Sequence, residues 1–568
     1  MRAHSGIRLA AVAAAALLLA GCAGLPTTGA PQPGLAIGDD AEAPPFTLTA
    51  EKPRAGDGPE EIVAGFLEAS MTPVGDWEIA QEYLTEDFKS TWKPDMGVAI
   101  DTSVESRRIA STVQADDEEA TSAEVRVELD QIASVDADGA YSALPAPGKS
   151  TYRLTRTEGG EWRIADAPDG IVLDTDTFGQ VYQKYALKYF DTSWSHLVPD
   201  VRWFPRRAAM ATSISRALIS GQPSGWLAPA VRSAFTEDVS LAGDAVVVEA
   251  SVASVSLSRA ALTASPTVLA RMRTQLEASL VEAGVSEVRF TVDGALLDAD
   301  TVPVDDTIVD PGVLVLNGEM FGTTTSGSAL TPVDGLTDQF DRIADPIRSL
   351  DISATATLAA MQLRDGRVFA VTAGDSVGLD ERSGLIEPSL DPFGFTWTVP
   401  SDHPDRLKAV SAQVEQHDIA RAWPSADSIS HLRVSADGAR VAAVVTTGGQ
   451  RRVVVFAVLR GEDSKPTELG EIPLEVGHVN GPVQGLAWIG SDALAVLSGT
   501  PEPTLTTYAV GGPSSSSPAP DGSVAIAGAR TPTGLRVLTA DGTVYAQRGS
   551  SWQIAVQDVL VLGTRAGY

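Results

Sequence analysis

Apolar and polar positions divide the chain into five successive stretches. The first has a short basic start and then an uncharged apolar run from Leu9 to Ala20. This run is about a dozen residues long, whereas crossing a hydrocarbon core takes roughly 20. Residues 1–21 are therefore predicted to be a cleaved signal peptide rather than a transmembrane helix. Residues 22–58 are rich in Pro, Gly, Ala and Thr without apolar periodicity, which predicts a flexible tether.

Residues 59–179 show helical patterns first and strand patterns afterwards. Apolar residues from Ile62 to Leu67 recur at helical spacing. Strand-like segments follow, and the last two, 152–154 and 161–164, flank a Glu-Gly-Gly turn. This order predicts an α+β domain. Its closing hairpin is similar to the last strands of the cone-shaped nuclear transport factor 2 (NTF2) domains.

Residues 180–300 mix helices and strands in a way that is typical of a compact α/β domain. One helix has apolar residues at i, i+4, i+7 and i+8 from Met210, and it is predicted to end at Gly221 in a left-handed conformation. A second helix is predicted to begin after Ser265, a capping residue followed by proline, and to continue to Gly284. Strands are predicted over 245–248 and 288–292.

From residue 311 to residue 568 the pattern is all-β, and Asp-Gly pairs punctuate short apolar runs. Turns at Asp437, Asp492 and Asp541 follow one another at steps of 55 and 49 residues, close to the roughly 40 to 50 residues of a four-stranded propeller blade. The repeat predicts a divergent β-propeller of five or six blades, with a pair of β-sandwiches as the alternative. The serine run 513–518 is predicted to be a flexible loop.

Composition narrows the class of protein and of partner. A chain of 568 residues is long enough for about three or four domains. The predicted fold class is therefore multidomain, with an N-terminal α+β domain (NTF2-like cone), a central α/β domain and a C-terminal all-β propeller. The net charge of −32 argues against nucleic acid as a partner, because phosphates would be repelled. It also argues against binding to anionic lipid through charge.

The residues at the end of the apolar run carry the clearest chemistry. Cys22 is the single cysteine of the chain, so an internal disulfide is excluded. The small Ala20 and Gly21 before it let the peptide lie extended in a peptidase cleft, and Leu19-Ala20-Gly21-Cys22 resembles the bacterial lipobox. We expect Leu19, Ala20 and Gly21 to be recognised by the signal peptidase and Cys22 to become an N-palmitoyl, S-diacylglycerol cysteine. Two or three acyl chains form a stable membrane anchor; the alternative is a free cysteine.

Several short motifs follow one another along the chain: Tyr189-Phe190, Val198-Pro199-Asp200, Arg202, Leu218–Gly221, Val255–Ser258, Gln275-Leu276, Gly284–Val288, Val292–Gly294, Gly534–Arg536, Asp541–Tyr545 and Trp552. With these motifs and the order of its predicted domains, the chain resembles the actinobacterial LpqB lipoproteins over nearly the whole mature chain. The central block is similar to a germination and sporulation (GerMN) module, and the end of the chain is similar to the last blade of the family. The resemblance implies an accessory lipoprotein of the Mtr two-component system that contacts the extracytoplasmic part of the sensor histidine kinase. Such a protein would modulate signalling in cell-wall homeostasis and cell division.

One short motif suggests a serine hydrolase. Residues 374–378 match the G-x-S-x-G pattern around Ser376, which requires a strand before the serine and a helix after it. A strand pattern precedes Ser376, but no helical apolar face follows. The available bases, His403, His417 and His431, are not placed beside it by anything in the sequence. We expect a loop of a propeller blade here and no catalytic residue.

Other candidate sites have simpler explanations. Asp136-x-Asp138 and Asp298-x-Asp300 look like fragments of a calcium loop but lack the later glutamate ligand, so we expect hairpin turns and solvated loops and no metal site. One cysteine and six histidines allow no zinc motif. The aromatic and polar group Trp194, His196, Trp203 and Phe204 is typical either of a recognition surface or of a core with an edge.

The favoured interpretation is a non-enzymatic, lipid-anchored accessory protein on the outer face of the plasma membrane that uses no cofactor. Its expected partners are the membrane lipid and the extracytoplasmic domain of a sensor histidine kinase, with no nucleic acid. A cell-wall glycan or peptide binder, with peptidoglycan as the partner, is the second interpretation. A hydrolase built on Ser376 is the third.

Overall fold

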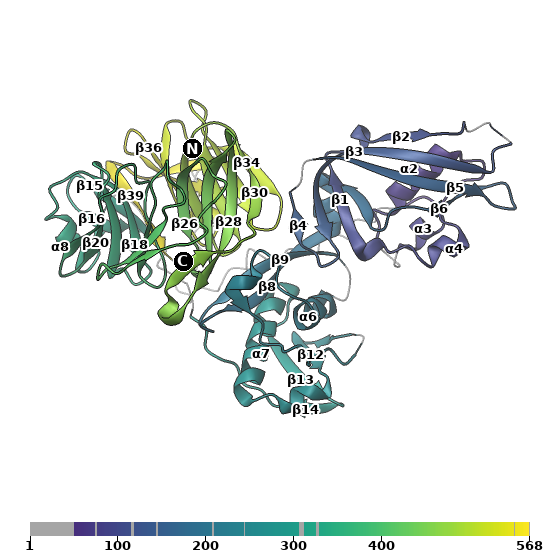
Figure 1. Cartoon of the computed structure of the whole chain (residues 1–568), viewed down its shortest axis with the longest axis horizontal. Coiled ribbons are helices and arrows are strands. Elements are labelled where there is room, and N and C mark those ends of the chain that lie inside the picture. The colour runs from purple at the N-terminus through teal and green to yellow at the C-terminus, as the bar shows by residue number, and fades with distance from the viewer. Residues whose placement is uncertain are drawn as a thin grey trace, which may run out of the picture. The chain divides into compact units, whose positions relative to one another are not determined.

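The computed structural model describes residues 50–566 except 74–76, 115–116, 118, 144–145, 207–209, 244, 306–311, 325–328 and 550. An N-terminal module, a central module and a C-terminal propeller follow one another in this part of the chain (Figure 1). All three belong to one compact unit, Ala50–Tyr568.

Helix α2 (Pro59–Ala69) provides the apolar core of the N-terminal module. It begins with Pro59, whose missing N–H costs nothing in the first turn of a helix. Ile62, Phe66 and Leu67 are buried, as the helical spacing predicted. The Phe66 ring lies 5.1 Å from the ring of Trp92 and 6.1 Å from that of Tyr152 on the sheet. Two short helices follow, α3 (Glu78–Gln81) and α4 (Glu86–Lys89).

A curled sheet forms the rest of this module. Its strands have the order β6-β5-β3-β1-β7, and all of these neighbours are antiparallel except β1 and β7, which are parallel. The turn predicted before β6 is present, with Gly160 at a φ of 84°. Helix α5 (Thr175–Val181) then leads to the central module. The strands are β1 (Gly97–Asp101), β2 (Arg108–Ser111), β3 (Ser122–Asp136), β4 (Tyr141–Ser142), β5 (Ala146–Arg156), β6 (Trp162–Asp166) and β7 (Ile171–Asp174).

The central module combines a long two-stranded ribbon with a helix-covered sheet. The ribbon is β8 (Tyr182–Asp191) paired with β9 (Leu197–Pro205), and β10 (Val231–Arg232) adds to its other edge. The sheet has the order β11-β12-β13-β14, in which β12 and β13 are parallel and joined by helix α7. These strands are β11 (Val247–Glu249), β12 (Val252–Ser256), β13 (Glu287–Val292) and β14 (Ala295–Leu297).

Both helices of this module lie where their apolar spacing predicted them. Helix α7 (Pro266–Leu280) begins after Ser265, whose hydroxyl accepts a hydrogen bond from Val268 N. Helix α6 (Met210–Ser220) stops at Gly221, but the left-handed conformation predicted there is wrong, because Gly221 does not have a positive φ. Glycine suits the position for a different reason: a Cβ atom would lie 2.2 Å from the Ala217 carbonyl oxygen.

The C-terminal region forms a propeller. The eight-stranded sheet contains two blades and the other four sheets contain one each, which gives six blades among the described residues. Strand β39 closes the ring because it pairs antiparallel with β15 and parallel with β18. The first blade consists of β39 (Val559–Ala566), β15 (Val313–Asn317), β16 (Phe321–Thr324) and β17 (Thr331–Pro332). Helix α8 (Leu336–Phe340) leads to the second blade, which consists of β18 (Ile347–Ser353), β19 (Leu358–Leu363), β20 (Val368–Thr372) and β21 (Ser376–Asp380).

The four remaining blades follow in chain order. The fourth blade of the propeller, β26 to β30, has a fifth strand, β30, which pairs with the long strand β28. Their strands are β22 (Ser389–Leu390), β23 (Phe395–Thr398), β24 (Lys408–Ser411) and β25 (Gln416–Asp418); β26 (Ser428–Val434), β27 (Arg440–Thr447), β28 (Gln450–Arg460), β29 (Pro466–Leu469) and β30 (Leu474–Val479); β31 (Val483–Ile489), β32 (Ala493–Ser498), β33 (Thr504–Ala509) and β34 (Ser514–Pro518); and β35 (Ser523–Ala527), β36 (Arg536–Thr539), β37 (Val544–Arg548) and β38 (Ser551–Val556).

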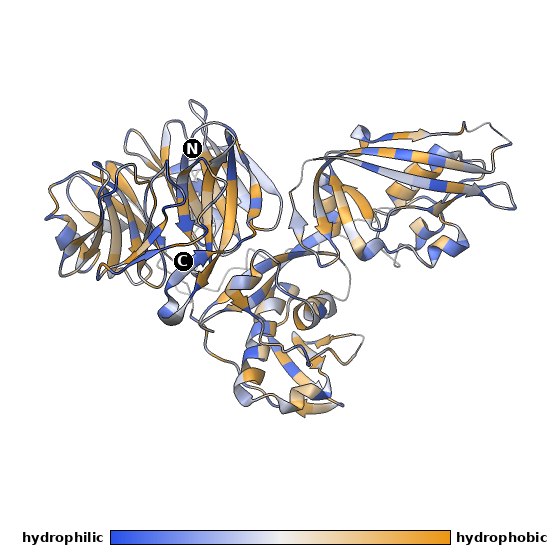
Figure 2. Cartoon of the chain, in the orientation of Figure 1, coloured by the Kyte–Doolittle hydropathy of each residue, from blue (hydrophilic) through white to orange (hydrophobic). Residues whose placement is uncertain are grey.

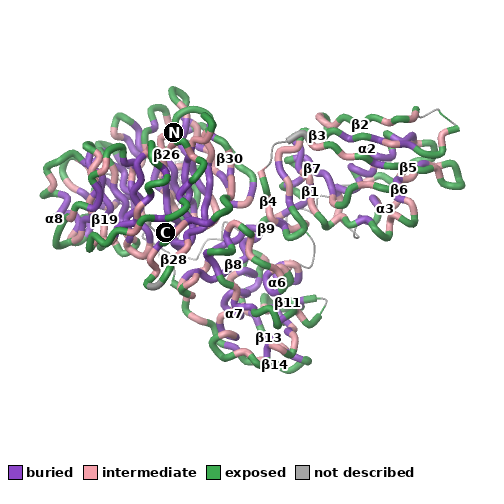
Figure 3. The backbone as a smooth tube through the Cα atoms, viewed as in Figure 1, coloured by how far each residue is buried: buried purple, intermediate pink, exposed green. Residues whose placement is uncertain are grey.

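Apolar side chains between neighbouring blades form the propeller core. Buried residues follow the strands, and exposed polar residues gather at the loops (Figures 2 and 3). Trp488 on β31 is 1% exposed, and its indole donates a 3.0 Å hydrogen bond to the Arg433 carbonyl on β26 of the preceding blade. Burying such large aromatic side chains is a major source of stability.

Asp-Gly turns occur where the sequence predicted them. Gly366, Gly438 and Gly542 all have positive φ values, which glycine adopts without steric cost. In the turn of the fourth blade, Asp437 accepts a hydrogen bond from Ala439 N and pairs with the fully buried Arg440. The predicted loop at 513–518 is wrong, because Ser514–Pro518 is strand β34, the outer strand of the fifth blade.

Candidate binding site

The β8–β9 ribbon joins the three modules through Trp203. The Trp203 N–H donates to the Gly139 carbonyl of the N-terminal module at 2.8 Å. The indole N–H of the same residue donates to the Gly511 carbonyl of the propeller, also at 2.8 Å. Its ring lies 4.8 Å from the ring of Phe178 and 6.3 Å from that of Tyr141. Lys184 on β8 adds an ion pair with Asp492 at 2.7 Å.

A buried ion pair lies beside this contact. The side chains of Arg202 and Asp200 are 4% and 2% exposed, and they are 2.8 Å apart. The Arg202 guanidinium also donates to the carbonyls of Asp138 and Gln222, at 3.1 Å each. Asp200 accepts from the Ser224 N–H and hydroxyl, both at 2.7 Å. The pair thus connects β9 to a loop of the N-terminal module and to the segment after α6.

The predicted aromatic group forms contacts within the chain. The Trp194 ring packs 5.1 Å from Phe190 and lies under the guanidinium of Arg271, 4.0 Å from its Cζ atom. The His196 ring lies edge-on to Phe393 of the propeller at 5.7 Å. Phe204 packs 6.2 Å from Tyr185. Of the two interpretations, a core with an edge describes these contacts.

A cavity with a volume of about 610 Å³ lies next to Trp203. The N-terminal module contributes one wall, including Tyr141 and Phe178. Strand β30 contributes a second wall, and β33 with β34 contributes a third. This volume is within the range that is typical of small-molecule sites.

The third wall is rich in hydroxyl groups. Thr504, Thr506, Ser514 and Ser516 all line the cavity. Thr506 pairs with Ser516 in the strand register, and their hydroxyl oxygens are 2.9 Å apart. At the base of the wall, the Tyr508 hydroxyl donates to the His478 carbonyl at 2.9 Å. Burial raises the pKa of Tyr141 to about 12, so its phenol stays protonated at neutral pH.

The Glu475 carboxylate lines the cavity and is paired with Arg452, which lies outside the lining. Glu475 lies 3.1 Å from Arg452 and 3.4 Å from the His478 imidazole. The cavity therefore presents hydroxyl, amide and aromatic groups rather than an excess of one charge. Such groups suit recognition of an uncharged polar ligand.

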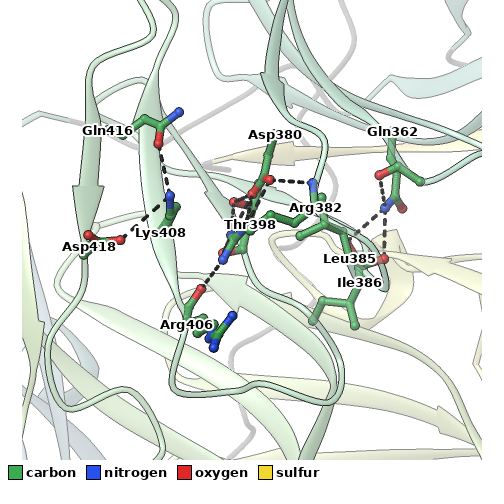
Figure 4. Close-up of polar contacts among 11 residues, drawn as sticks. Gln362, Asp380, Arg382, Leu385, Ile386, Thr398, Arg406, Lys408, Gln416 and Asp418 are labelled. Atoms are coloured by element: carbon green, nitrogen blue, oxygen red, sulfur yellow. Dashed lines mark hydrogen bonds and ion pairs between the residues drawn. The ribbon is translucent and has the colours of Figure 1, made fainter.

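Ser376 does not occupy a nucleophile elbow. It is exposed and begins β21, the outer strand of the second blade, so a strand and not a helix follows it; the predicted loop is wrong. The carboxylate at the other end of this strand, Asp380, is engaged by Arg382 and by the Thr398 hydroxyl (Figure 4). Burial alone would raise the pKa of Asp380, but these donors hold that pKa below its usual value.

The fragment at Asp136 forms a turn, and the fragment at Asp298 lies in a loop after β14. Asp136 accepts hydrogen bonds from the N–H groups of Asp138 and Ala140. The carbonyl of Ala299 accepts from Arg273 at 2.7 Å. Within the described ranges, no group of three or more His, Cys, Asp or Glu residues could hold a metal ion.

The anchor residues Leu19, Ala20, Gly21 and Cys22 lie outside the described residues, as do the predicted signal peptide and most of the tether. In the part of the chain that the structure covers, no helix is both long and apolar enough to cross a membrane.

Apart from Trp203, the residues that line the cavity were not indicated as part of a site by the sequence. In strands β33 and β34, hydroxyl-bearing residues lie on both faces. These strands therefore lack the alternation of apolar and polar residues that identifies a half-buried strand. The available signal was the tandem of two Thr/Ser-rich segments, 504–507 and 514–517, separated by a Gly-Gly turn.

Three family models match the chain in succession. Residues 52–179 match the N-terminal domain of Lipoprotein LpqB. Residues 185–298 match the Germane domain of sporulation and spore germination proteins, and residues 319–561 match the Lipoprotein LpqB beta-propeller domain.

Full-length relatives carry the same description. Lipoprotein LpqB of Thermobifida fusca (strain YX) is 29% identical, over 92% of this chain and 91% of the relative. Lipoprotein LpqB of Nocardia farcinica (strain IFM 10152) is 26% identical, over 88% of this chain and 86% of the relative. Among solved structures, a chain of a nidogen/laminin complex is 9% identical with a TM-score of 0.32, covering 44% of this chain and 97% of that chain.

Proposed function

Because the chain belongs to the LpqB lipoprotein family, we propose that it is an accessory lipoprotein that acts by binding a sensor kinase. Diacylated Cys22 anchors it to the outer face of the plasma membrane, and it binds the extracytoplasmic part of the histidine kinase of a two-component system. Binding modulates signalling in cell-wall homeostasis and cell division. The protein is a regulator without cofactor or catalytic activity.

The observation that supports this proposal is the succession of three family domains over residues 52–561. The environment of Ser376 adds support, since an exposed serine on an outer blade strand lacks the elbow that a hydrolase of this pattern needs. The N-terminal module is proposed to be an NTF2-like cone, because α2 packs on a curled sheet through Phe66 and Tyr152.

The proposed mechanism is a difference in affinity for two states of the kinase. A ligand that binds both states equally shifts nothing, however tightly it binds. A binder that is itself held in one shape binds its preferred state more tightly, because little of the binding free energy is spent on ordering it. The hydrogen bonds of Trp203 and Arg202 support this role, since they connect the modules through buried groups.

A direct binding measurement tests the proposal. The extracytoplasmic segment of the cognate sensor kinase is immobilised, and the purified full-length lipoprotein in detergent is passed over it. The matched control is the corresponding segment of an unrelated sensor kinase from the same organism. We expect saturable binding to the cognate segment alone. Equal binding to both segments, or no saturable binding, would contradict the proposal.

A further inference from the structure

We propose that the 610 Å³ cavity beside Trp203 is a binding site for a short neutral oligosaccharide. Its walls come from the N-terminal module, from β30 and from the β33–β34 hairpin of the fifth blade. This inference is independent of the proposed kinase contact.

The hydroxyl wall provides the polar contacts. Thr504, Thr506, Ser514 and Ser516 share one face of the hairpin, because Thr506 is paired with Ser516 and strand residues two apart point the same way. All four are solvent-accessible to some extent. A hydroxyl group can both donate and accept a hydrogen bond, so a row of them matches the hydroxyl groups of a sugar.

Several polar groups of the cavity have no partner in the protein. Among the described residues, the side chains of Asn480, Thr504 and Ser514 make no hydrogen bond, and neither does the Tyr141 phenol. Tyr141 is half-buried, and burial raises its pKa to about 12, so its O–H is available as a donor. Asn480 and Ser514 are exposed and Thr504 is partly exposed, so a ligand can reach these groups by replacing water.

Aromatic and apolar groups complete the site. The aromatic residues Tyr141, Phe178, Trp203 and Tyr508 line the cavity, together with the apolar Ile100 and Val479. Small-molecule sites typically combine such apolar surface with a few convergent polar groups. The C–H faces of a pyranose ring pack on apolar surface while its hydroxyls reach the hairpin.

The charges favour a neutral ligand. Glu475 is already engaged by Arg452 at 3.1 Å and by His478 at 3.4 Å. An anionic ligand would meet this carboxylate without an unpaired cation among the described lining residues, and a cationic ligand would compete with Arg452. A peptide would pair its backbone with the outer edge of β34 rather than with side-chain hydroxyls.

The hairpin supplies a matched pair of variants. The cavity variant is Thr506→Val with Ser516→Ala, and the control variant is Thr507→Val with Ser515→Ala. Thr507 is paired with Ser515 on the opposite face of the same two strands. Each variant removes two hydroxyls from neighbouring cross-strand pairs, and only the cavity variant changes the cavity wall. The cavity variant also removes the 2.9 Å contact between the Thr506 and Ser516 hydroxyls, so its thermal unfolding is compared with that of the control variant.

Ligand-observed NMR on full-length protein in detergent measures binding of two neutral probes, chitotriose and maltotriose. We expect at least one probe to bind with a Kd of about 1 mM or lower. The cavity variant should weaken that binding about 10-fold, since each lost hydrogen bond contributes modestly, while the control variant should bind like the native chain. Thermal unfolding of both variants checks that they fold.

Three results would overturn the inference. One is that neither sugar binds at about 10 mM, and another is that both variants lose binding equally. The third is that only an extended peptide binds. Because kinase binding is measured separately with the same proteins, failure of the sugar site and failure of the proposed kinase contact are distinguishable.

Discussion

Replacing Arg202 by methionine should destabilise the junction between the modules strongly. The substitution keeps a long apolar stem but removes the guanidinium, which is 4% exposed. Three acceptors then lose their donor: the carboxylate of Asp200 and the carbonyls of Asp138 and Gln222. Asp200 retains only the hydrogen bonds from Ser224.

The expected cost follows from leaving a buried charge without its partner. Breaking such a pair on one side typically costs about 3–5 kcal/mol. Arg289→Met provides the matched control, because Arg289 forms an ion pair with Glu287 in the same module but is 53% exposed. An exposed pair of this kind contributes about 0–1 kcal/mol. The double variant Arg202→Met/Asp200→Leu should be less destabilised than Arg202→Met alone, since it no longer buries an unpaired carboxylate.

Urea unfolding gives the free energies, and hydrogen exchange with mass spectrometry locates the change. We expect faster exchange in peptides covering residues 136–142 and 220–226 in Arg202→Met and native exchange in Arg289→Met. A loss of less than about 1 kcal/mol in Arg202→Met, or a double variant that is worse than the single one, would refute this reasoning.

Three further predictions concern separate parts of the chain. Cys22→Ala should move the protein from the membrane to the soluble fraction of cells, because the acyl chains on Cys22 are the expected anchor. A variant that stays wholly in the membrane fraction would contradict this prediction. Burial lowers the pKa of His431 to about 4, so the folded state disfavours the protonated ring and the free energy of unfolding falls as the pH falls from about 6.5 towards 4. In His431→Gln, the free energy of unfolding should fall less over that pH interval. The same pH dependence in the variant and the native chain would refute this prediction. Ser376→Ala should change the free energy of unfolding by less than about 0.5 kcal/mol and leave labelling by a serine-reactive probe as low as in the native chain; labelling that depends on Ser376 would favour the hydrolase.

Local patterns predicted the elements of the fold well. Ser265 caps α7 because its hydroxyl accepts from Val268 N, as Ser-Pro predicted. The Asp-Gly turns identified the blades because Gly366, Gly438 and Gly542 occupy conformations that favour glycine. The number of blades could not be predicted, since closing the ring pairs Leu314 with Gly563, and these residues lie near opposite ends of the propeller sequence.

Such local patterns could not predict the candidate site. Its cavity is lined by residues from the N-terminal module, the ribbon and the propeller, and no spacing in the sequence brings them together. Strand β34 was missed because its serines face the cavity on one side and remain exposed on the other, so no apolar alternation marks it. Trp203 was identified as one of an aromatic group, but its bond to Gly511 depends on tertiary packing.

In vivo crosslinking tests the proposed contact with a sensor histidine kinase in intact cells. The lipidated protein is crosslinked in intact cells and captured from the membrane fraction, and everything retained is identified by mass spectrometry. We expect recovery of a sensor histidine kinase, crosslinked through its extracytoplasmic segment, and loss of that kinase from captures of Cys22→Ala. Recovery of wall fragments alone, without any kinase, would contradict it.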